Sequence, residues 1–135
     1  MNRLSPELFS APCIKRIEQP VLTKDDIPYN ASLIFNAGVA KYNGQYVMVF
    51  RNDYGPSEET YQQIPFRTSL GFATSDDGIN WKASEKTIFD NKNLLPEDEI
   101  KRLYDPRITV IDGKPYLCMA MDTRPGVRGC IAEID

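Results

Sequence analysis

One pattern of residues occurs twice in this chain, with constant spacing between the copies. Phe35-Asn36 matches Tyr104-Asp105, and the turn pair Asn43-Gly44 matches Asp112-Gly113. Position 35 corresponds to 104, 36 to 105 and 43 to 112, so no insertion separates the matches. A β-rich unit that recurs along a chain is typical of propeller blades. The repeat therefore predicts an all-β fold of the propeller type.

Turn chemistry divides each copy into strands. Asn-Gly and Asp-Gly pairs suit two-residue type I′ hairpins, because both central residues tolerate positive φ. The sequence predicts strands over 34–42, 45–52, 66–75 and 80–89, which would form a four-stranded antiparallel meander. A second set is expected over 106–111, 116–121 and 128–134, and a short helix over 96–102.

The predicted elements divide the chain into three parts. Residues 1–27 form an irregular lead-in with several prolines, residues 28–90 the first blade, and residues 91–135 a linker and an incomplete second blade. Repeat units bury their faces only against neighbours, and closed propellers have about 4–8 blades. We therefore expect a piece of a longer protein, with assembly of several chains as the alternative.

Composition excludes several classes of function. The net charge is −3 and no strongly basic stretch is present, which argues against nucleic acid as a partner. The apolar runs are strand-sized, so neither a membrane helix nor a secretory signal is expected, and a cytoplasmic location is predicted. Histidine is absent, which excludes a Ser-His-Asp or Cys-His mechanism within this segment. The cysteines Cys13, Cys118 and Cys130 have no metal or disulfide spacing.

Polar residues recur where the repeated hairpins begin and end. The first hairpin begins at Asn36 and ends at 51–53, and the second begins at Asp105 and ends at 122–124. The two strands of a hairpin are antiparallel, so both ends should face one mouth of a central channel. Amides and carboxylates bind sugar hydroxyls, and arginine binds anions such as phosphate. Each residue alone has a structural explanation, such as a turn at Asp105-Pro106, and only their coincidence favours a binding site.

Five stretches of the chain resemble the β-1,4-mannoside phosphorylases of glycoside hydrolase family 130. They are Ile34-Phe35-Asn36-Ala37-Gly38-Val39, Val49-Phe50-Arg51-Asn52-Asp53, the segment 67–81, Tyr104-Asp105-Pro106-Arg107-Ile108-Thr109 and Met121-Asp122-Thr123-Arg124. The resemblance implies a five-bladed β-propeller, of which this chain holds roughly the first two blades as an N-terminal portion.

The resemblance also implies a reaction. Members of the family cleave β-mannosides with inorganic phosphate and release α-mannose 1-phosphate with inversion. Asp105 matches the general acid, whose proton passes through the 3-hydroxyl of the mannose, and Arg124 matches a phosphate-binding arginine. The positions that match the sugar site are Asn36, Arg51, Asn52, Asp53, Arg67 and Asp122. Phosphate is already an anionic nucleophile, so neither a second carboxylate base nor a metal or other cofactor is expected.

Two other functions are compatible with the sequence. One is hydrolysis of β-mannosides on the same propeller, and the other is a non-catalytic sugar-binding or assembly role for the fragment. Further phosphate ligands would lie beyond residue 135, so the 135-residue chain alone is expected to be inactive. The expected partners are a β-mannoside oligosaccharide and phosphate. The acceptor sugar is left open, as is the oligomeric state, and a homo-oligomer is one option.

Overall fold

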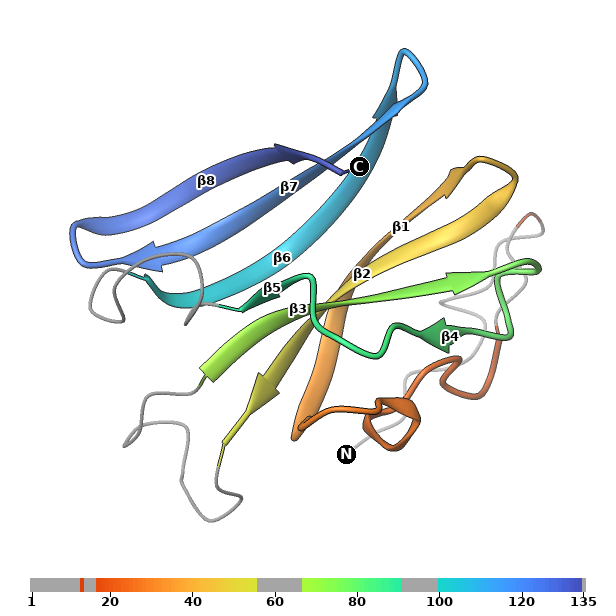
Figure 1. Cartoon of the computed structure of the whole chain (residues 1–135), viewed down its shortest axis with the longest axis horizontal. Helices are drawn as coiled ribbons and strands as arrows, with labels where there is room; N and C mark the ends of the chain where they lie inside the picture. Colours follow the sequence, from red (N-terminus) through yellow and green to blue (C-terminus); the bar gives the residue numbers. More distant parts are fainter. Residues whose placement is uncertain (1–12, 14–16, 56–66, 91–99, 135) are drawn as a thin grey trace.

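The structure, a computed structural model, describes residue 13 and residues 17–55, 67–90 and 100–134. These residues form two antiparallel sheets that stand side by side (Figure 1). The first sheet contains β1 (Leu33–Tyr42), β2 (Gln45–Tyr54) and β3 (Arg67–Ser75), with the short strands β4 (Lys82–Ala83) and β5 (Phe89–Asp90) both paired to β3. The second contains β6 (Ile100–Ile111), β7 (Lys114–Thr123) and β8 (Gly126–Glu133). The predicted all-β fold is confirmed.

The predicted hairpin turns are present in both sheets. Asn43 and Gly44 have φ angles of 49° and 84°, and Asp112 and Gly113 have 51° and 78°. Two successive positive φ angles are the signature of a type I′ turn, whose twist matches that of the flanking strands. The lead-in is irregular over the described residues except for one 3-10 turn, η2 (Lys24–Asp26).

Two of the predicted elements are wrong. The strand expected over 80–89 is divided into β4 and β5: Ala83 pairs with Ala73 and Phe89 with Leu70, and residues 85–87 loop out between them. The helix expected over 96–102 is contradicted at 100–102, because β6 already begins at Ile100, which is buried and pairs with Thr123. Residues 96–99 lie outside the described residues.

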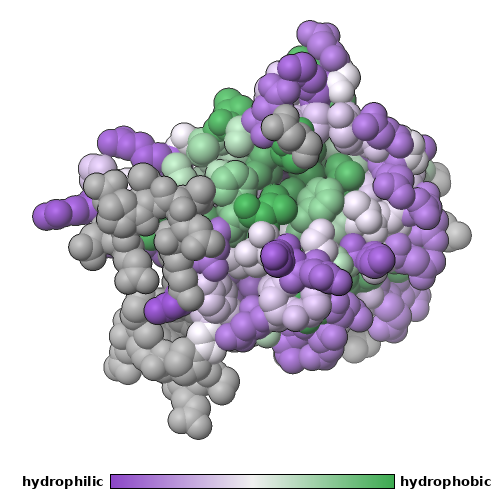
Figure 2. Space-filling view, in the orientation of Figure 1, coloured by the Kyte–Doolittle hydropathy of each residue, from purple (hydrophilic) through white to green (hydrophobic). Residues whose placement is uncertain are grey.

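The core lies between the two sheets. Val49 and Leu70 of the first sheet pack with Leu103 and Leu117 of the second, and all four are fully buried. Figure 2 shows apolar side chains gathered where the sheets meet, with hydrophilic residues around them. A second cluster, around Phe50, lies on the other face of the first sheet, against residues of the lead-in such as Ile27. Strand β2 is therefore buried on both faces.

Backbone atoms of the two sheets come very close at one place, which we call the seam: the contact of β1 residues 35–38 with β6 residues 104–108. A Cβ added to Gly38 would lie 2.6 Å from the carbonyl oxygen of Pro106 and 2.7 Å from the Cα of Arg107. Only glycine fits this approach. Deeper in the interface, the backbone N–H of Leu103 donates to Thr68 Oγ1 over 2.7 Å, which ties β6 to β3.

One face of the first sheet packs against the second sheet, and the equivalent face of the second sheet is exposed. In the first sheet Phe72 pairs with Val49 and packs into the core, whereas at the matching position Ile131 pairs with Cys118 and is 73% exposed. No helix among the described residues is long and apolar enough to cross a membrane.

Candidate functional site

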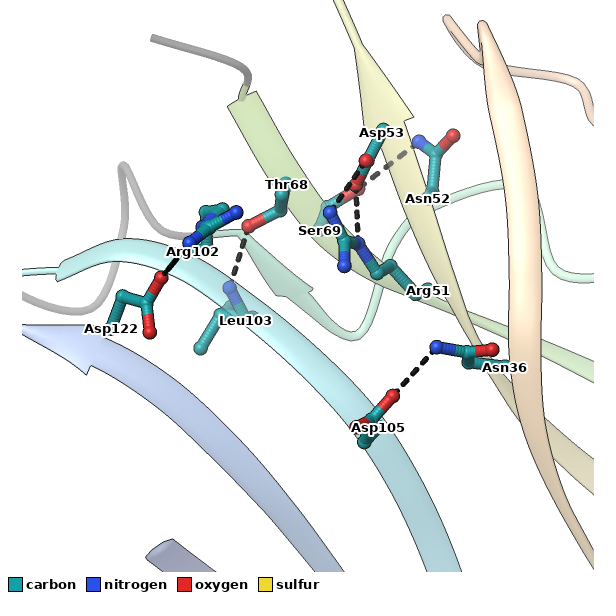
Figure 3. A network of polar contacts seen from close by, with 10 residues as sticks. All are labelled: Asn36, Arg51, Asn52, Asp53, Thr68, Ser69, Arg102, Leu103, Asp105 and Asp122. Carbon is teal, nitrogen blue, oxygen red and sulfur yellow. Dashed lines mark hydrogen bonds and ion pairs between the residues drawn. The ribbon is translucent and has the colours of Figure 1, made fainter. Parts of the chain in front are cut away.

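Asn36 and Asp105, the matched residues of the repeat, are in direct contact at the seam. Asn36 Nδ2 donates a hydrogen bond to Asp105 Oδ1 over 2.6 Å (Figure 3). Each side chain comes from an interruption of strand pairing, between Phe35 and Gly38 in one sheet and between Tyr104 and Arg107 in the other. Asp105 is exposed to solvent, so its carboxyl group is open to a ligand.

The local backbone explains why these residue types stand here. Asn36 has a φ of 52° and Asp105 a φ of 51°, both in the left-handed region. Asn and Asp tolerate this region better than other non-glycine residues do. Each bulge re-aims its side chain away from the alternation of the strand, a use of bulges that is common beside active sites. Pro106, fully buried, follows Asp105 directly and anchors the second bulge in the interface.

Arg51 and Asp53 form a buried ion pair beside the seam. Arg51 Nε and Nη2 donate to Asp53 Oδ1 and Oδ2, each over 2.7 Å. The side chains are only 8% and 1% exposed. The guanidinium lies 4.6 Å from the ring centroid of Phe35 and 5.8 Å from that of Tyr104, so the matched aromatic residues of both sheets flank it. Arg51 is thus already engaged by a carboxylate within the described structure.

Asp122, at the position matching Asp53, has different partners. It accepts hydrogen bonds from Arg102 Nε over 2.6 Å and from the Tyr104 hydroxyl over 2.8 Å. Burial opposes ionisation of Asp122, but these two donors outweigh it and lower the pKa of Asp122. The hydrogen bond from the Tyr104 hydroxyl to Asp122 also raises the pKa of Tyr104. The positive charge of Arg51 also lowers the pKa of Asp122, so the ion pair of the first sheet influences the carboxylate of the second.

The remaining predicted residues lie elsewhere. Asn52 is buried, and its Nδ2 donates to the backbone oxygen of Asn30 and to Ser69 Oγ. Its Oδ1 has no hydrogen-bond partner among the described residues. Arg67 is exposed at the start of β3, opposite Tyr54.

Arg124 is exposed in the turn between β7 and β8. It lies four positions beyond Ala120, the partner of Tyr104, which is about 13 Å of extended chain. No hydrogen bond or ion pair joins Arg124 to Asp105 among the described residues.

The structure reveals two further polar residues that the sequence pattern did not single out. Arg102 forms an ion pair with Asp122. The repeat did not indicate this residue, because the matching position in the first copy is Leu33, and the residues around Arg102 were predicted to be helical. Thr68 accepts a hydrogen bond from the Leu103 backbone N–H. The only sequence signal for Thr68 was that it is a polar residue in a strand expected to be buried. Among the described residues, no group of three or more His, Cys, Asp or Glu side chains is placed to bind a metal ion.

The chain is similar to two mannoside phosphorylases. A 1,2-β-oligomannan phosphorylase from Thermoanaerobacter sp. (strain X514) is 34% identical over 77% of the chain and 34% of its own length. A β-1,2-mannobiose phosphorylase from the same organism is 31% identical over 62% of the chain and 28% of its own length. The chain thus spans about a third of these relatives.

Solved structures and a family model add to this. A glycosyl hydrolase from Bacteroides ovatus superposes with a TM-score of 0.60 and 27% identity, over 78% of the chain and 29% of that protein. The model of the glycoside hydrolase family 130, described as β-1,4-mannooligosaccharide phosphorylase, matches residues 8–134. Because this match covers nearly the whole sequence, the chain belongs to glycoside hydrolase family 130.

Proposed function

We propose that the protein containing this chain cleaves β-mannosides with inorganic phosphate and that Asp105 is its general acid. The observation that carries the proposal is the exposed Asp105 carboxyl group, held at the seam by its repeat partner Asn36. The proton would move from Asp105 to the departing sugar oxygen through the 3-hydroxyl of the mannose, while a phosphate oxygen attacks C1 and gives α-mannose 1-phosphate. Family membership and the two phosphorylase relatives support this reaction.

The ion pairs at the site indicate which charged residues are available to bind phosphate and which are available to bind the mannose. Arg51 and Arg102 are engaged by carboxylates, which leaves them less available to a phosphate ion. Arg124 is exposed and takes part in none of the ion pairs found among the described residues. Arginine binds phosphate through a planar fork of donors. We assign phosphate binding to Arg124, and we assign the positioning of the mannose to Asp122.

The test uses the full-length gene product, phosphate, and β-1,2- and β-1,4-mannobiose in separate reactions. Both linkages are needed, because the curated relatives are named for β-1,2 links and the family model for β-1,4 links. We expect release of mannose 1-phosphate, and a 10²- to 10⁴-fold lower kcat in Asp105→Asn, the usual contribution of a general acid. Asp112→Asn is the matched control, since Asp112 has the same φ of 51° but lies in a hairpin turn.

Three results would overturn the proposal. Turnover that does not depend on phosphate would indicate a hydrolase. Full activity in Asp105→Asn would remove the acid from its role. Sugar binding without turnover would leave a binding module. We also expect the 135-residue chain alone to be inactive, which the same assay on that chain tests.

A further inference from the structure

We propose that Asn36 is a positioning residue that selects which oxygen of Asp105 carries the catalytic proton. The proposal rests on the proposed function and assigns Asn36 a task different from holding the sugar. Its basis is the 2.6 Å contact between Asn36 Nδ2 and Asp105 Oδ1, made across the interface of two sheets.

The direction of the hydrogen bond decides the protonation site. The amide nitrogen of asparagine carries two hydrogens and only donates. Asp105 Oδ1 therefore accepts, and because the carbonyl oxygen of a protonated carboxyl group accepts more strongly than its hydroxyl oxygen, the contact favours the acidic hydrogen on Oδ2. Without Asn36 the proton could occupy either oxygen, and only one of the two would point at the substrate.

The same contact serves the step after proton transfer. The proton leaves Oδ2 for the departing sugar oxygen, directly or through a substrate hydroxyl. The bond between C1 and that oxygen breaks with its electrons on the oxygen, and a phosphate oxygen bonds to C1. Asp105 is then a carboxylate whose charge is shared by Oδ1, and the N–H of Asn36 already points at Oδ1. Donors aimed in advance at developing charge need no rearrangement during the reaction.

The backbone holds Asn36 rigidly enough for this task. Asn36 has a left-handed φ of 52° within a bulge, and the Gly38 contact with Pro106 and Arg107 fixes the distance between the sheets. Arg107 Nη1 donates to the Pro106 backbone oxygen over 2.7 Å and approaches the Asn36 backbone oxygen at 3.5 Å. The main chain that carries each member of the pair is therefore held in place by the close approach at Gly38 and by the Arg107 side chain.

The test compares two substrates in Asn36→Gly, made in the full-length gene product. Glycine adopts a positive φ without cost, so this variant removes the amide while keeping the backbone. On mannobiose, whose leaving sugar needs the proton, we expect kcat to fall about 10- to 100-fold, the size of a misplaced catalytic group. On 2,4-dinitrophenyl β-mannoside, whose leaving group needs no proton, we expect a change of less than about 3-fold. Asn43→Gly, a left-handed asparagine in an exposed turn, is the control and should behave as wild type on both.

Each outcome has a separate meaning. Equal losses on both substrates would overturn the proposal and indicate that Asn36 binds the mannose itself. No loss on either would also overturn it. A wild-type protein inactive on both substrates would refute the proposed function, so the contact is measured independently by NMR. The side-chain amide resonances of Asn36 should shift in Asp105→Gly and not in Asp112→Gly, and unchanged resonances would show that the hydrogen bond does not form in solution.

Discussion

Asp53 and Asp122 occupy matching positions in the two sheets, yet each is neutralised in a different way. Asp53 takes its arginine from two residues earlier on the same strand, and the pair is shielded from water. Asp122 takes its arginine from the neighbouring strand and adds the Tyr104 hydroxyl, and the Arg102 side chain remains 41% exposed. The repeat preserves the carboxylate and not its partner.

The buried Arg51–Asp53 pair and the partly exposed Arg102–Asp122 pair differ in how much it costs to break them. A desolvated ion pair is costly to break, because the remaining charge has neither partner nor water. A solvated pair exchanges its partner for water at little cost. We infer that the Arg51–Asp53 pair fixes the first sheet at the seam, while Asp122 is free to exchange partners when a ligand arrives.

Replacing one arginine at a time should give the largest difference between the two pairs. Arg51→Met leaves Asp53 buried and unpaired and should lower the free energy of unfolding by about 3–5 kcal/mol. Arg102→Met should cost less, about 1 kcal/mol, because the Asp122 side chain is 17% exposed against 1% for Asp53 and keeps the hydrogen bond from the Tyr104 hydroxyl. Urea denaturation of the chain measures both.

A second variant checks the cause of that loss. Adding Asp53→Asn to Arg51→Met removes the buried charge and should recover part of the stability. Equal costs for Arg51→Met and Arg102→Met would show that burial does not distinguish the two pairs.

A smaller effect is expected from a polar contact that carries no charge. Thr68→Val keeps the shape of the side chain but leaves the buried N–H of Leu103 without an acceptor, which should cost about 1–3 kcal/mol. Thr109→Val, at an exposed position of β6, should be close to neutral. A neutral Thr68→Val would mean that this contact between the sheets does not contribute to stability.

The sequence predicted the features that local chemistry determines. The Asn43-Gly44 turn needs only its own two residues, and the matching of Asn36 with Asp105 followed from the repeat. It could not predict the Arg102 pairing, since the local charges favoured a helix and the contact with β7 overrode them. The inward position of Asn52 was available in principle, because alternation along a strand places it on the face opposite to Arg51 and Asp53.

The smallest effect concerns pH and tests the solvated pair directly. The pKa of Asp122 is lowered on folding, so its contribution to stability is complete above about pH 4 and is lost as the pH falls through the lowered value. The pKa of Tyr104 is raised, so its contribution is complete below about pH 10 and is lost as the pH rises through the raised value. Solvent screening limits each contribution to less than about 1 kcal/mol. Urea midpoints measured across the pH range should fall less steeply on the acid side in Asp122→Asn and less steeply on the alkaline side in Tyr104→Phe. If Tyr104→Phe follows the wild-type curve while Asp122→Asn does not, the second sheet holds its carboxylate through Arg102 alone, and if both follow it, neither partner of Asp122 contributes in solution.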